Sequence, residues 1–474
     1  MAFGEQNGTL RDVQSEPLQA SSTAAIEAWL HSASTTDPHA AATQAADRPP
    51  STALRATFAC TPYWLAPNAQ PYTRHAWLVH DAEGLRALIT HEPVEASSQA
   101  EAARISGAVL LDLAQPLPLY PVHVDKPWGQ EIWFSGVEAR GVSLVGHPSA
   151  GIPLPELLAL APEWICRGRE RELILLKILA PHADPDFGQL YFELHERKRE
   201  AYVVLNVDAA AWPQGTGEVR VGFDAARRQQ LGDEGLRTAF ADAVAAYEAT
   251  RREIDAVIDD LQANANVAPG SVLPLQQARA LLAQVPAHLQ ARELQQRNTM
   301  QAFTSIQSLR AGDVLNLPTH VPHALQHGVR VVEFQTPTFE RRILYFTQKV
   351  HTQPDWDTAQ AIAMMKLDAP QLQRTSALTN AGEVFVETIV DFPDFRVLRV
   401  HLPARSDASA RQTPSCFRPP ATDYALCMCI DGEIAIGRGR FGREQACLVP
   451  AVATALAVEN CGNAGTVFLW AIPK

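Results

Sequence analysis

The sequence predicts a mainly β protein, a sandwich or jelly-roll barrel, with a helical insertion. Short runs rich in β-branched and aromatic residues recur between Gly, Pro, Asn and Asp turns, which is typical of many short strands. Between about 224 and 300 the apolar residues instead recur every three, four or seven positions, as on one face of a helix. Strand-like runs then return, so the predicted order along the 474 residues is β, helical, β and β.

The first 120 residues of the chain are the least informative. Residues 1–50 are rich in Ala, Ser, Thr and Gln and have few aromatic side chains, so we expect a mobile tail with a short helix around 24–31. Residue runs typical of β-strands begin near residue 57. Residues 51–119 therefore form an N-terminal elaboration, to which the sequence assigns no role.

The remaining elements follow from local patterns. Apolar spacing of three to four predicts a short helix at 154–162, and a longer apolar stripe from Leu236 to Leu261 predicts a long helix. That helix is interrupted at 264–274, and a second helical segment follows. The predicted strands are 75–80, 108–113, 131–137, 141–146, 172–180, 200–207, 313–317, 329–337, 395–404, 424–437, 444–451 and 466–473.

The composition excludes several classes of partner. Forty basic residues against 52 acidic ones give a formal net charge of −12, which argues against binding to nucleic acid or to an anionic membrane. The chain has no apolar run long enough to span a membrane and no signal-peptide pattern at its start. Its seven cysteines contain no CxxC pair. We therefore expect a reduced, cytoplasmic protein, a monomer or homodimer, that acts on a small molecule.

Four residues from two separate stretches are candidate metal ligands. Glu193 and His195 are two positions apart, so on a strand their side chains share one face. Glu200 follows a four-residue turn, and an antiparallel strand would bring its carboxylate back beside them. Much later in the chain, His323 begins another strand and supplies a fourth donor. Either cluster alone is common in proteins that bind no metal, but the presence of both favours a metal site.

The donor types restrict the metal but do not select it. A mixture of His and carboxylate ligands without thiolate suits Zn²⁺, Mn²⁺, Fe²⁺, Co²⁺ or Ni²⁺. We expect one divalent ion per chain.

The two clusters resemble the two sequence motifs of the cupin superfamily. The stretch from Glu193 to Glu200 is similar to the first motif, HxHx4E, with Glu in place of the first His. The stretch from Gly312 to His323 is similar to the second motif, Gx5PxGx2H, with His320 where a Gly is usual.

Within the cupins, the chain most resembles the type I mannose-6-phosphate isomerases (phosphomannose isomerases). In that family a Gln-x-His pair, a Glu in a Lys-x-Glu triplet and a distant His hold a zinc ion. The matching positions here are Glu193, His195, Lys198-x-Glu200 and His323. Further stretches resemble the family in the same order over roughly residues 120–474: Lys126-Pro-Trp128-Gly129, the strand with Lys177, the segment with Glu333 and Arg341 or Arg342, and the C-terminal β region.

This resemblance implies a double-cupin fold, that is, two jelly-roll barrels. It places a metal-binding cupin domain at 120–211 and 301–350, and a helical insertion between them at 212–300. A second cupin-like domain without metal follows at 351–474.

The resemblance also implies an activity, the interconversion of the aldose and ketose forms of a hexose or hexose phosphate through a cis-enediol. The metal implied is most simply zinc. The implied catalytic residues are Lys198, Glu333 and Arg342, and the implied substrate-binding residues are Trp128, Lys177 and Arg341.

Three departures from the family pattern stand out. Glu193 replaces a neutral Gln and adds a negative charge to the metal shell. Tyr191 stands where a family serine helps to bind phosphate. The spacing from Glu333 to the arginine is one residue short, so the choice between Arg341 and Arg342 stays open.

Two other functions use the same residues. One is a cupin of different chemistry, such as an Fe²⁺ dioxygenase, in which Lys177, Lys198 and Arg342 would have no role. The other is a non-catalytic sugar-binding or regulatory cupin, in which Tyr191 and Glu193 mark a site that has lost turnover.

Overall fold

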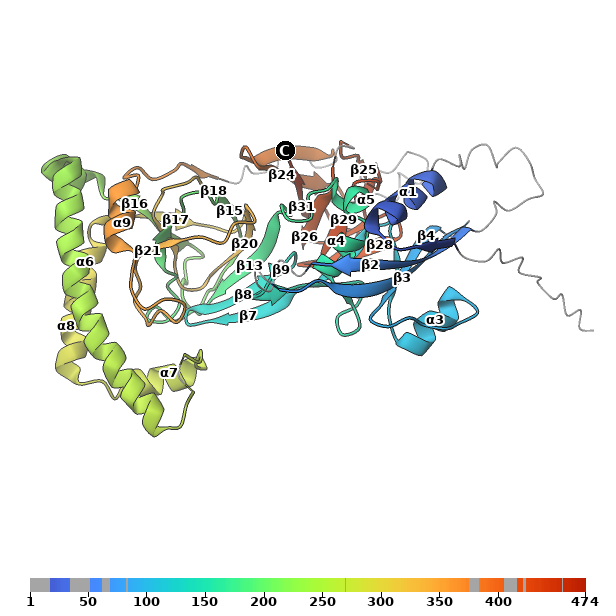
Figure 1. Ribbon diagram of the computed structural model, residues 1–474. Coiled ribbons are helices and arrows are strands. Elements are labelled where there is room, and N and C mark those ends of the chain that lie inside the picture. Colours follow the sequence, from blue (N-terminus) through green and yellow to red (C-terminus); the bar gives the residue numbers. More distant parts are fainter. Residues whose placement is uncertain are drawn as a thin grey trace, which may run out of the picture.

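The computed structural model describes residues 18–34, 52–61, 69–81, 84–268, 270–374, 383–404, 416–420, 423–453 and 455–474. Within these ranges the molecule is a row of four parts, with the helical insertion at one end, then two β barrels, then an N-terminal sheet (Figure 1). The predicted fold class is confirmed: the chain is mainly β, with two cupin barrels and a helical insertion.

The first barrel consists of two antiparallel sheets and carries the candidate metal ligands. The larger sheet has the strand order β22-β18-β15-β20-β13-β8-β7, and the smaller one has the order β17-β16-β19-β14-β21. The strands of the larger sheet are β7 (Val122–Lys126), β8 (Gly129–Trp133), β13 (Leu175–Pro181), β15 (Glu200–Val207), β18 (Val314–Leu317), β20 (Val329–Gln335) and β22 (Leu372–Gln373). Those of the smaller sheet are β14 (Phe192–Leu194), β16 (Gly217–Phe223), β17 (Thr304–Leu309), β19 (His323–Leu325) and β21 (Arg342–Tyr345).

The larger sheet of the first barrel is buried on both faces. Its inner face contributes side chains such as Val204 to a cluster that includes Val221 of the smaller sheet. Its outer face contributes Ile178 and Phe334 to a second cluster, which also contains residues of the second barrel and of the N-terminal sheet. Burial on both sides explains why the strands at 172–180 and 200–207 show continuous apolar runs.

The second barrel is built in the same way. Its larger sheet has the order β12-β11-β6-β29-β26-β31-β24-β23, and its smaller sheet has the order β25-β30-β27-β28. The strands are β6 (Leu117–Tyr120), β11 (Leu144–Val145), β12 (Ile152–Pro153), β23 (Phe385–Asp391), β24 (Phe395–Leu402), β25 (Cys416–Phe417), β26 (Ala425–Asp431), β27 (Glu433–Ile436), β28 (Gly439–Gly442), β29 (Ala446–Val449), β30 (Val458–Asn460) and β31 (Thr466–Pro473). Cys427 and Cys429 pack in its core beside Trp470, as expected for structural cysteines.

The structure divides the two barrels differently from the predicted boundary at residue 351. Strands β6, β11 and β12 belong to the second barrel, because β6 pairs with β29, with Leu119 opposite Ala446. Conversely, β22 pairs with β18 of the first barrel, and helix α9 (Thr358–Met364) shares a hydrophobic cluster with β21. An alternating pattern identifies a strand but not its partner, so the sequence did not predict this exchange.

The N-terminal part forms a sheet of order β1-β2-β3-β4-β5, in which β1 runs parallel to β2. Its elements are β1 (Leu18–Ala20), helix α1 (Thr23–Ser34), β2 (Thr52–Cys60), β3 (Tyr72–Asp81), β4 (Gly84–Thr90), helix α3 (Gln99–Ser106) and β5 (Leu110–Asp112). The expected helix at 24–31 is confirmed, but this stretch is not a free tail, because Ile26, Trp29 and Leu30 are buried in the shared core. Residues 1–17 and 35–50 lie outside the described residues.

The helical insertion packs on the smaller sheet of the first barrel. Helix α6 (Ala225–Asn264) buries the predicted stripe, including Leu236, Phe240 and Tyr247, and ends where the sequence predicted. The second predicted segment is two helices, α7 (Leu275–Leu282) and α8 (Ala287–Gln301). The start of the predicted insertion, 217–223, is barrel strand β16 instead. Smaller elements elsewhere are β9 (Val137–Glu138), β10 (Gly141–Val142), α4 (Leu154–Leu160) and α5 (Pro162–Cys166).

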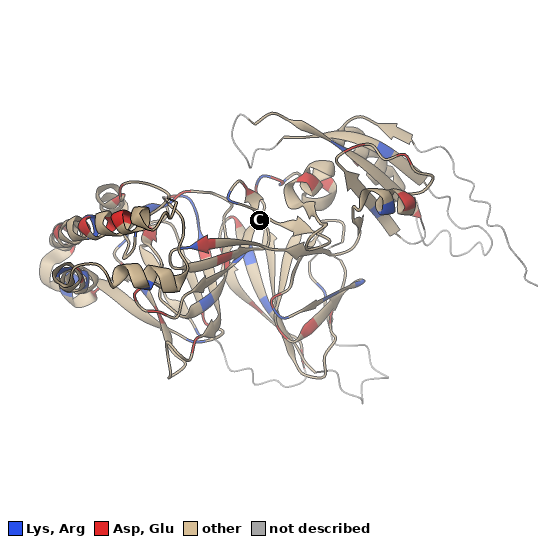
Figure 2. Cartoon of the chain, turned by 90° about the horizontal axis from the view of Figure 1, so that it is seen from below, with Lys and Arg blue, Asp and Glu red and all other residues tan. Residues whose placement is uncertain are grey.

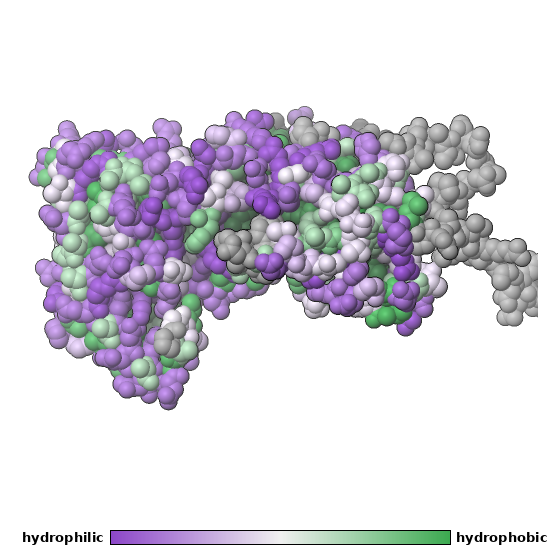
Figure 3. Space-filling view, viewed as in Figure 1, coloured by the Kyte–Doolittle hydropathy of each residue, from purple (hydrophilic) through white to green (hydrophobic). Residues whose placement is uncertain are grey.

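The surface carries charges of both signs. Lys and Arg are interspersed with Asp and Glu along the insertion and both barrels (Figure 2). Hydrophilic residues cover most of the face in Figure 3, and hydrophobic ones gather only in small groups there. None of the helices in the described ranges combines the length and hydropathy that crossing a bilayer requires.

A buried ion pair joins the N-terminal sheet to helix α4. Arg74 of β3 donates two hydrogen bonds, of 2.7 and 2.8 Å, to the carboxylate of Glu156, whose side chain is 5% exposed. We expect Glu156→Ala to lower the free energy of unfolding by about 3 kcal/mol, because the guanidinium then stays buried without its partner. Urea denaturation followed by circular dichroism measures the loss.

The matched control is Asp391→Ala, which removes ion pairs with Arg396 and Lys474 at the surface, where the Asp391 side chain is 56% exposed. It should cost much less than Glu156→Ala, because solvent screens exposed ion pairs. Equal losses for the two variants would show that the Arg74–Glu156 pair does not anchor the N-terminal sheet.

Candidate functional site

The four predicted ligands come together where the two sheets of the first barrel face each other. Glu193 lies in β14, His195 directly follows that strand, and His323 begins the neighbouring strand β19. Glu200 begins β15, which belongs to the larger sheet, so β14 and β15 do not pair as the sequence predicted. The turn at 196–199 crosses between the sheets instead. The carboxylate of Glu200 therefore reaches the histidines from the opposite wall of the barrel.

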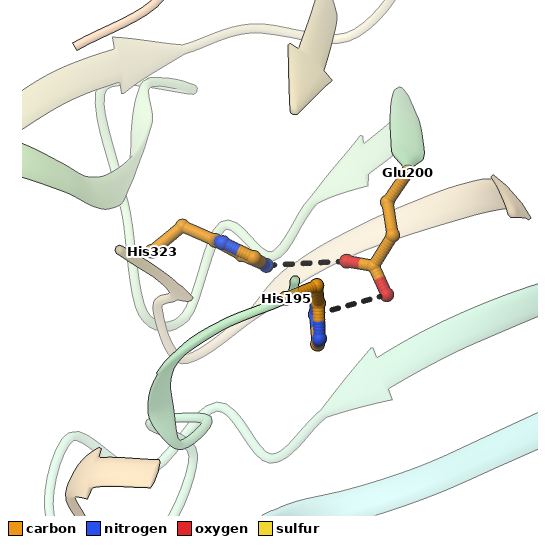
Figure 4. Close-up of side chains that lie close together, drawn as sticks. All are labelled: His195, Glu200 and His323. Carbon is orange, nitrogen blue, oxygen red and sulfur yellow. Dashed lines mark hydrogen bonds and ion pairs between the residues drawn. The ribbon is translucent and has the colours of Figure 1, made fainter. Parts of the chain in front are cut away.

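Three of these residues form a compact group, called the metal cluster here: His195, Glu200 and His323. Their ligand atoms all lie within 4.8 Å of one another. His195 Nε2 is 3.4 Å from Glu200 Oε1, and His323 Nε2 is 3.1 Å from Glu200 Oε2. Both rings turn toward the carboxylate (Figure 4), and all three side chains are 3% exposed. The spacing and burial match two imidazoles and one carboxylate that share an ion.

The hydrogen bonds of the two histidines leave their Nε2 atoms as bases. His195 Nδ1 lies 3.0 Å from the carbonyl oxygen of Glu340, and His323 Nδ1 lies 2.9 Å from that of Val321. A carbonyl only accepts, so Nδ1 carries a hydrogen in both rings, and Nε2 keeps a lone pair in the neutral form of each ring. Those lone pairs face the oxygens of Glu200, which also have no hydrogen to donate.

The protonation states of the cluster support a cation between these atoms. Burial, and then the charge of Lys198, lowers the pKa of His195, which keeps its ring neutral. Burial alone would raise the pKa of Glu200, but the charge of Lys198 lowers it well below its ordinary value. His195 Nε2 is buried and has no hydrogen-bond partner within the described ranges. A divalent ion satisfies all these donors at once, so the residues fit the metal that the sequence predicted.

The turn that carries Glu200 into place is organised by Glu340. Its carboxylate accepts hydrogen bonds of 3.0 Å from the backbone amides of residues 196, 197 and 198. Burial opposes ionisation of Glu340, but these amides lower its pKa below the ordinary value. The backbone carbonyl of Glu340 also orients the ring of His195. Glu340 therefore positions His195 before the turn and Glu200 after it.

His320 explains why the cupin motif prefers Gly at that position. Its backbone is left-handed, with φ 68°, a conformation that costs little for Gly and more for other residues. The amide of His320 donates a hydrogen bond of 2.7 Å to the carbonyl oxygen of His195. This hydrogen bond thus connects the second sequence cluster, at 312–323, to the first, at 193–200.

A cavity opens beside the metal cluster. Among the described residues that line it, five are basic and five are acidic: Lys126, Arg140, Lys177, Lys198 and Arg341, and Glu131, Glu193, Glu200, Glu333 and Glu340. The lining is therefore formally neutral. A divalent ion at the metal cluster makes the cavity positive, which suits an anionic ligand.

Lys177 and Glu333 form a buried pair in this cavity. They are directly opposite each other on β13 and β20, and Lys177 Nζ lies 3.2 Å from Glu333 Oε2. Burial and the charge of Glu200 raise the pKa of Glu333 well above its ordinary value, against the effect of Lys177. Burial would lower the pKa of Lys177, but Glu131 and then Glu333 raise it, so the lysine stays charged.

Lys198 and Trp128 lie beside the same cavity. Lys198 is buried and its ammonium group contacts Glu200 Oε1 directly, so it compensates the charge of a ligand. Trp128 is 1% exposed and belongs to the core of the barrel, with the cavity on one side. Its ring is thus a wall of the cavity as well as a core side chain.

The structure separates the two arginines that the sequence left open. Arg341 lines the cavity, lies 3.5 Å from Glu193 and stacks at 4.3 Å over the ring of Tyr191. Arg342, the predicted catalytic arginine, is outside this lining and pairs with Glu196 at 2.7 Å. Of the two arginines, Arg341 is therefore the one that lines the cavity with Glu200. Adjacent residues on a strand point to opposite faces, which is why a one-residue uncertainty matters.

Glu193 lies beside the metal cluster without joining it. Its Oε1 is 3.8 Å from His195 Nε2, but it is not among the atoms that lie within 4.8 Å of one another. Three of the four predicted ligands are thus brought together, and the fourth is adjacent.

Several cavity residues were not singled out in the sequence. Glu131 lies 3.5 Å from Lys177 and 3.6 Å from Lys126, and accepts a hydrogen bond of 2.7 Å from Trp133 Nε1. Burial would raise the pKa of Glu131, but Lys177 and then Lys126 lower it to about 2. Strand alternation could have indicated Glu131, which shares a strand face with Trp133. No local pattern indicates Glu340, because its partners are backbone amides more than a hundred residues away.

Comparisons with known proteins support the fold. No protein-family model matches the chain, and no curated protein matches it. Among solved structures, phosphomannose isomerase from Salmonella typhimurium, in a single-residue mutant, is 14% identical, with a TM-score of 0.50, over 76% of this chain and 100% of that chain. Mannose 6-phosphate isomerase from Bacillus subtilis is 13% identical, with a TM-score of 0.48, over 76% and 99% of the two chains.

The chain shares the fold of the Salmonella typhimurium phosphomannose isomerase. At this level of identity the likeness shows the shared fold alone, so any assignment of chemistry rests on the residues of the cavity.

We expect Glu340→Ala to weaken binding of Zn²⁺ or Co²⁺ by about 10- to 100-fold, because residues that orient metal ligands have effects of this size. Competition with a coloured chelator measures the affinity. Glu196→Ala is the matched control, since Glu196 pairs with Arg342 outside the cavity lining. The same affinity in both variants would contradict a positioning role for Glu340.

Proposed function

We propose that the protein is a metal-dependent isomerase that interconverts the aldose and ketose forms of a hexose or hexose phosphate. One observation carries the proposal: Glu200 of the metal cluster and the Lys177–Glu333 pair line the same cavity. Aldose–ketose isomerisation needs a group that moves a proton between two carbons and cations that stabilise the enediolate oxygens. The cavity offers both kinds of group.

Glu333 is the candidate acid and base. It takes the proton from C2 of the aldose, and returns a proton to C1 as the ketose forms. Its pKa is raised well above the ordinary value, which makes the ionised carboxylate a stronger base toward a proton on carbon. Its Oε1 is buried without a hydrogen-bond partner in the described part of the chain, so one oxygen is available to substrate.

Lys177 and Lys198 are the candidate electrophiles. Both are buried and cationic beside the cavity, where they donate hydrogen bonds to the C1 and C2 oxygens as negative charge develops. His195, Glu200 and His323 would hold a divalent ion, which would supply a Lewis acid for those same oxygens. Arg341 binds an anionic group of the substrate, which a planar guanidinium suits when that group is a phosphate.

The positive charge of the loaded cavity favours a phosphorylated sugar. Five basic and five acidic side chains cancel, so the divalent ion supplies the excess. The family serine for phosphate is absent at Tyr191, and we assign phosphate binding to Arg341 in its place.

A second candidate is an Fe²⁺ dioxygenase. The metal cluster contains two His and one carboxylate, which is also the ligand set of non-haem iron oxygenases. It leaves the buried Lys177–Glu333 pair without a role, and for this reason the isomerase is preferred. Oxygen consumption by the iron-loaded protein would favour the dioxygenase.

We expect the metal-loaded protein to interconvert mannose 6-phosphate and fructose 6-phosphate, with deuterium from the solvent entering the sugar at C1 or C2. NMR in deuterated water follows both events. Glu333→Gln should lower kcat by at least about 100-fold, because it removes the acid and base. Removing the metal with a chelator should abolish turnover, and adding Zn²⁺ should restore it.

Arg342→Met is the control variant and should retain kcat, since Arg342 lies outside the cavity lining. An equal loss in both variants would contradict the assigned roles. Calorimetric binding of the sugar phosphate without conversion would instead favour a non-catalytic sugar-binding cupin.

A further inference from the structure

The N-terminal sheet, at the end of the molecule opposite the helical insertion, carries a cavity of its own (Figure 1). Its volume is about 280 Å³. As far as the chain is described, the lining comes from residues between 19 and 102, ahead of the stretch of roughly 120–474 that resembles the isomerases. The proposed function therefore gives this cavity no role.

Strand register explains how the cavity forms on the outer face of the sheet. Leu54 of β2 is buried in the shared core, so its neighbour Arg55 lies on the opposite face. Arg55 is directly opposite Trp77 of β3, which is directly opposite Leu88 of β4. These three side chains form a row across the sheet, and the loop at 93–95 and helix α3 line the cavity together with them.

Two hydrogen-bond donors in this row are buried without a partner. Arg55 donates from Nη1 to the carbonyl oxygen of Val94, at 3.3 Å, and from Nη2 to that of Ala96, at 2.9 Å. Both acceptors are neutral, so they do not compensate the positive charge of Arg55. Its Nε and the Nε1 of Trp77 have no hydrogen-bond partner in the described part of the chain. The guanidinium stacks at 4.1 Å over the indole, so the two donors belong to groups in direct contact.

Other polar groups at the cavity already have partners within the protein. Thr57 Oγ1 lies 3.3 Å from His75 Nδ1, and Thr90 donates a hydrogen bond of 2.7 Å to the carbonyl oxygen of Glu92. Among the described lining residues the acidic one is Glu95, which is exposed. A ligand that completes the hydrogen bonding of this cavity therefore supplies acceptors and negative charge.

We propose that this cavity binds a small monocarboxylate with an apolar body. The two oxygens of a carboxylate match the two unpaired donors, Arg55 Nε and Trp77 Nε1, and its charge compensates the guanidinium. A phosphate has three acceptor oxygens and a higher charge than these donors satisfy. The side chain of Leu88, which is 2% exposed, provides an apolar contact in the same row. The inference is independent of the proposed function, because it uses no residue of the first barrel.

Calorimetric titration of the full-length protein with benzoate tests this inference. Benzoate is the probe because it joins one carboxylate to an apolar ring. We expect a dissociation constant of about 1 mM or lower, as for a small ligand with one charged contact. Benzamide has nearly the same shape but no charge, so it should bind at least about tenfold more weakly.

Three variants locate the binding site. Arg55→Met and Trp77→Phe should each weaken benzoate binding by about tenfold, because each removes one donor to a charged oxygen. Trp77→Phe keeps an aromatic ring beside the guanidinium and leaves the loop contacts of Arg55 in place, so it tests the site even if Arg55→Met does not fold. Arg104→Met is the matched control and should bind as the unmodified protein does, since Arg104 is an exposed residue of helix α3 outside the cavity lining.

Four outcomes would overturn the inference. Equal affinity for benzoate and benzamide would show that the carboxylate is not recognised. Equal binding of benzoate by the Arg104→Met, Arg55→Met and Trp77→Phe variants would place it elsewhere in the molecule. Inorganic phosphate that binds more tightly than benzoate, and loses this advantage in Arg55→Met, would make the cavity a phosphate site. Benzoate that does not bind at millimolar concentration would contradict a carboxylate site altogether.

Discussion

The structure is organised around one electrostatic relationship: the buried carboxylate of Glu200 faces the Nε2 atoms of two imidazoles, which have no hydrogen to offer it when the rings are neutral. Both Nδ1 atoms are committed to backbone carbonyls, which fixes the lone pairs of His195 and His323 toward Glu200. Lone pairs that face one another in a buried space are unfavourable unless a cation lies between them. The two sheets, the Glu340 turn and the left-handed His320 all serve to hold these atoms in place.

The surroundings of the metal cluster show how a small barrel accommodates many buried charges. Lys198 compensates Glu200, Glu131 links Lys126 and Lys177, and Lys177 reaches Glu333. Each carboxylate therefore has a cationic neighbour, which offsets the cost of its burial. Glu333 keeps an unusually high affinity for a proton within this network, because it is the most deeply buried and lies near the charge of Glu200. That combination is what makes it the candidate for proton transfer.

The sequence predicted the parts of this site that depend on local spacing. Strand alternation predicted Glu193 with His195, and the strand starts at Glu200 and His323 supplied the rest of the cluster. The sequence did not predict the long-range contacts. These are the exchange of β6 and β22 between the two barrels, the 196–199 turn that crosses between the sheets, and the hydrogen bonds from backbone amides to the Glu340 carboxylate. The sequence left the choice between Arg341 and Arg342 open for a related reason, because one residue of register decides which face of a strand a side chain occupies. Helix α1 was placed correctly, but its burial depends on apolar surfaces contributed by distant parts of the chain.

The most direct test of the account is a crystal structure of the zinc-loaded protein with anomalous diffraction data collected at the zinc absorption edge. We expect one anomalous peak at about 2.0–2.2 Å from His195 Nε2, His323 Nε2 and a carboxylate oxygen of Glu200, as zinc–ligand distances require. Zinc found elsewhere in the molecule, or a cluster that stays empty in crystals containing excess zinc, would contradict the claim that these three residues hold the metal.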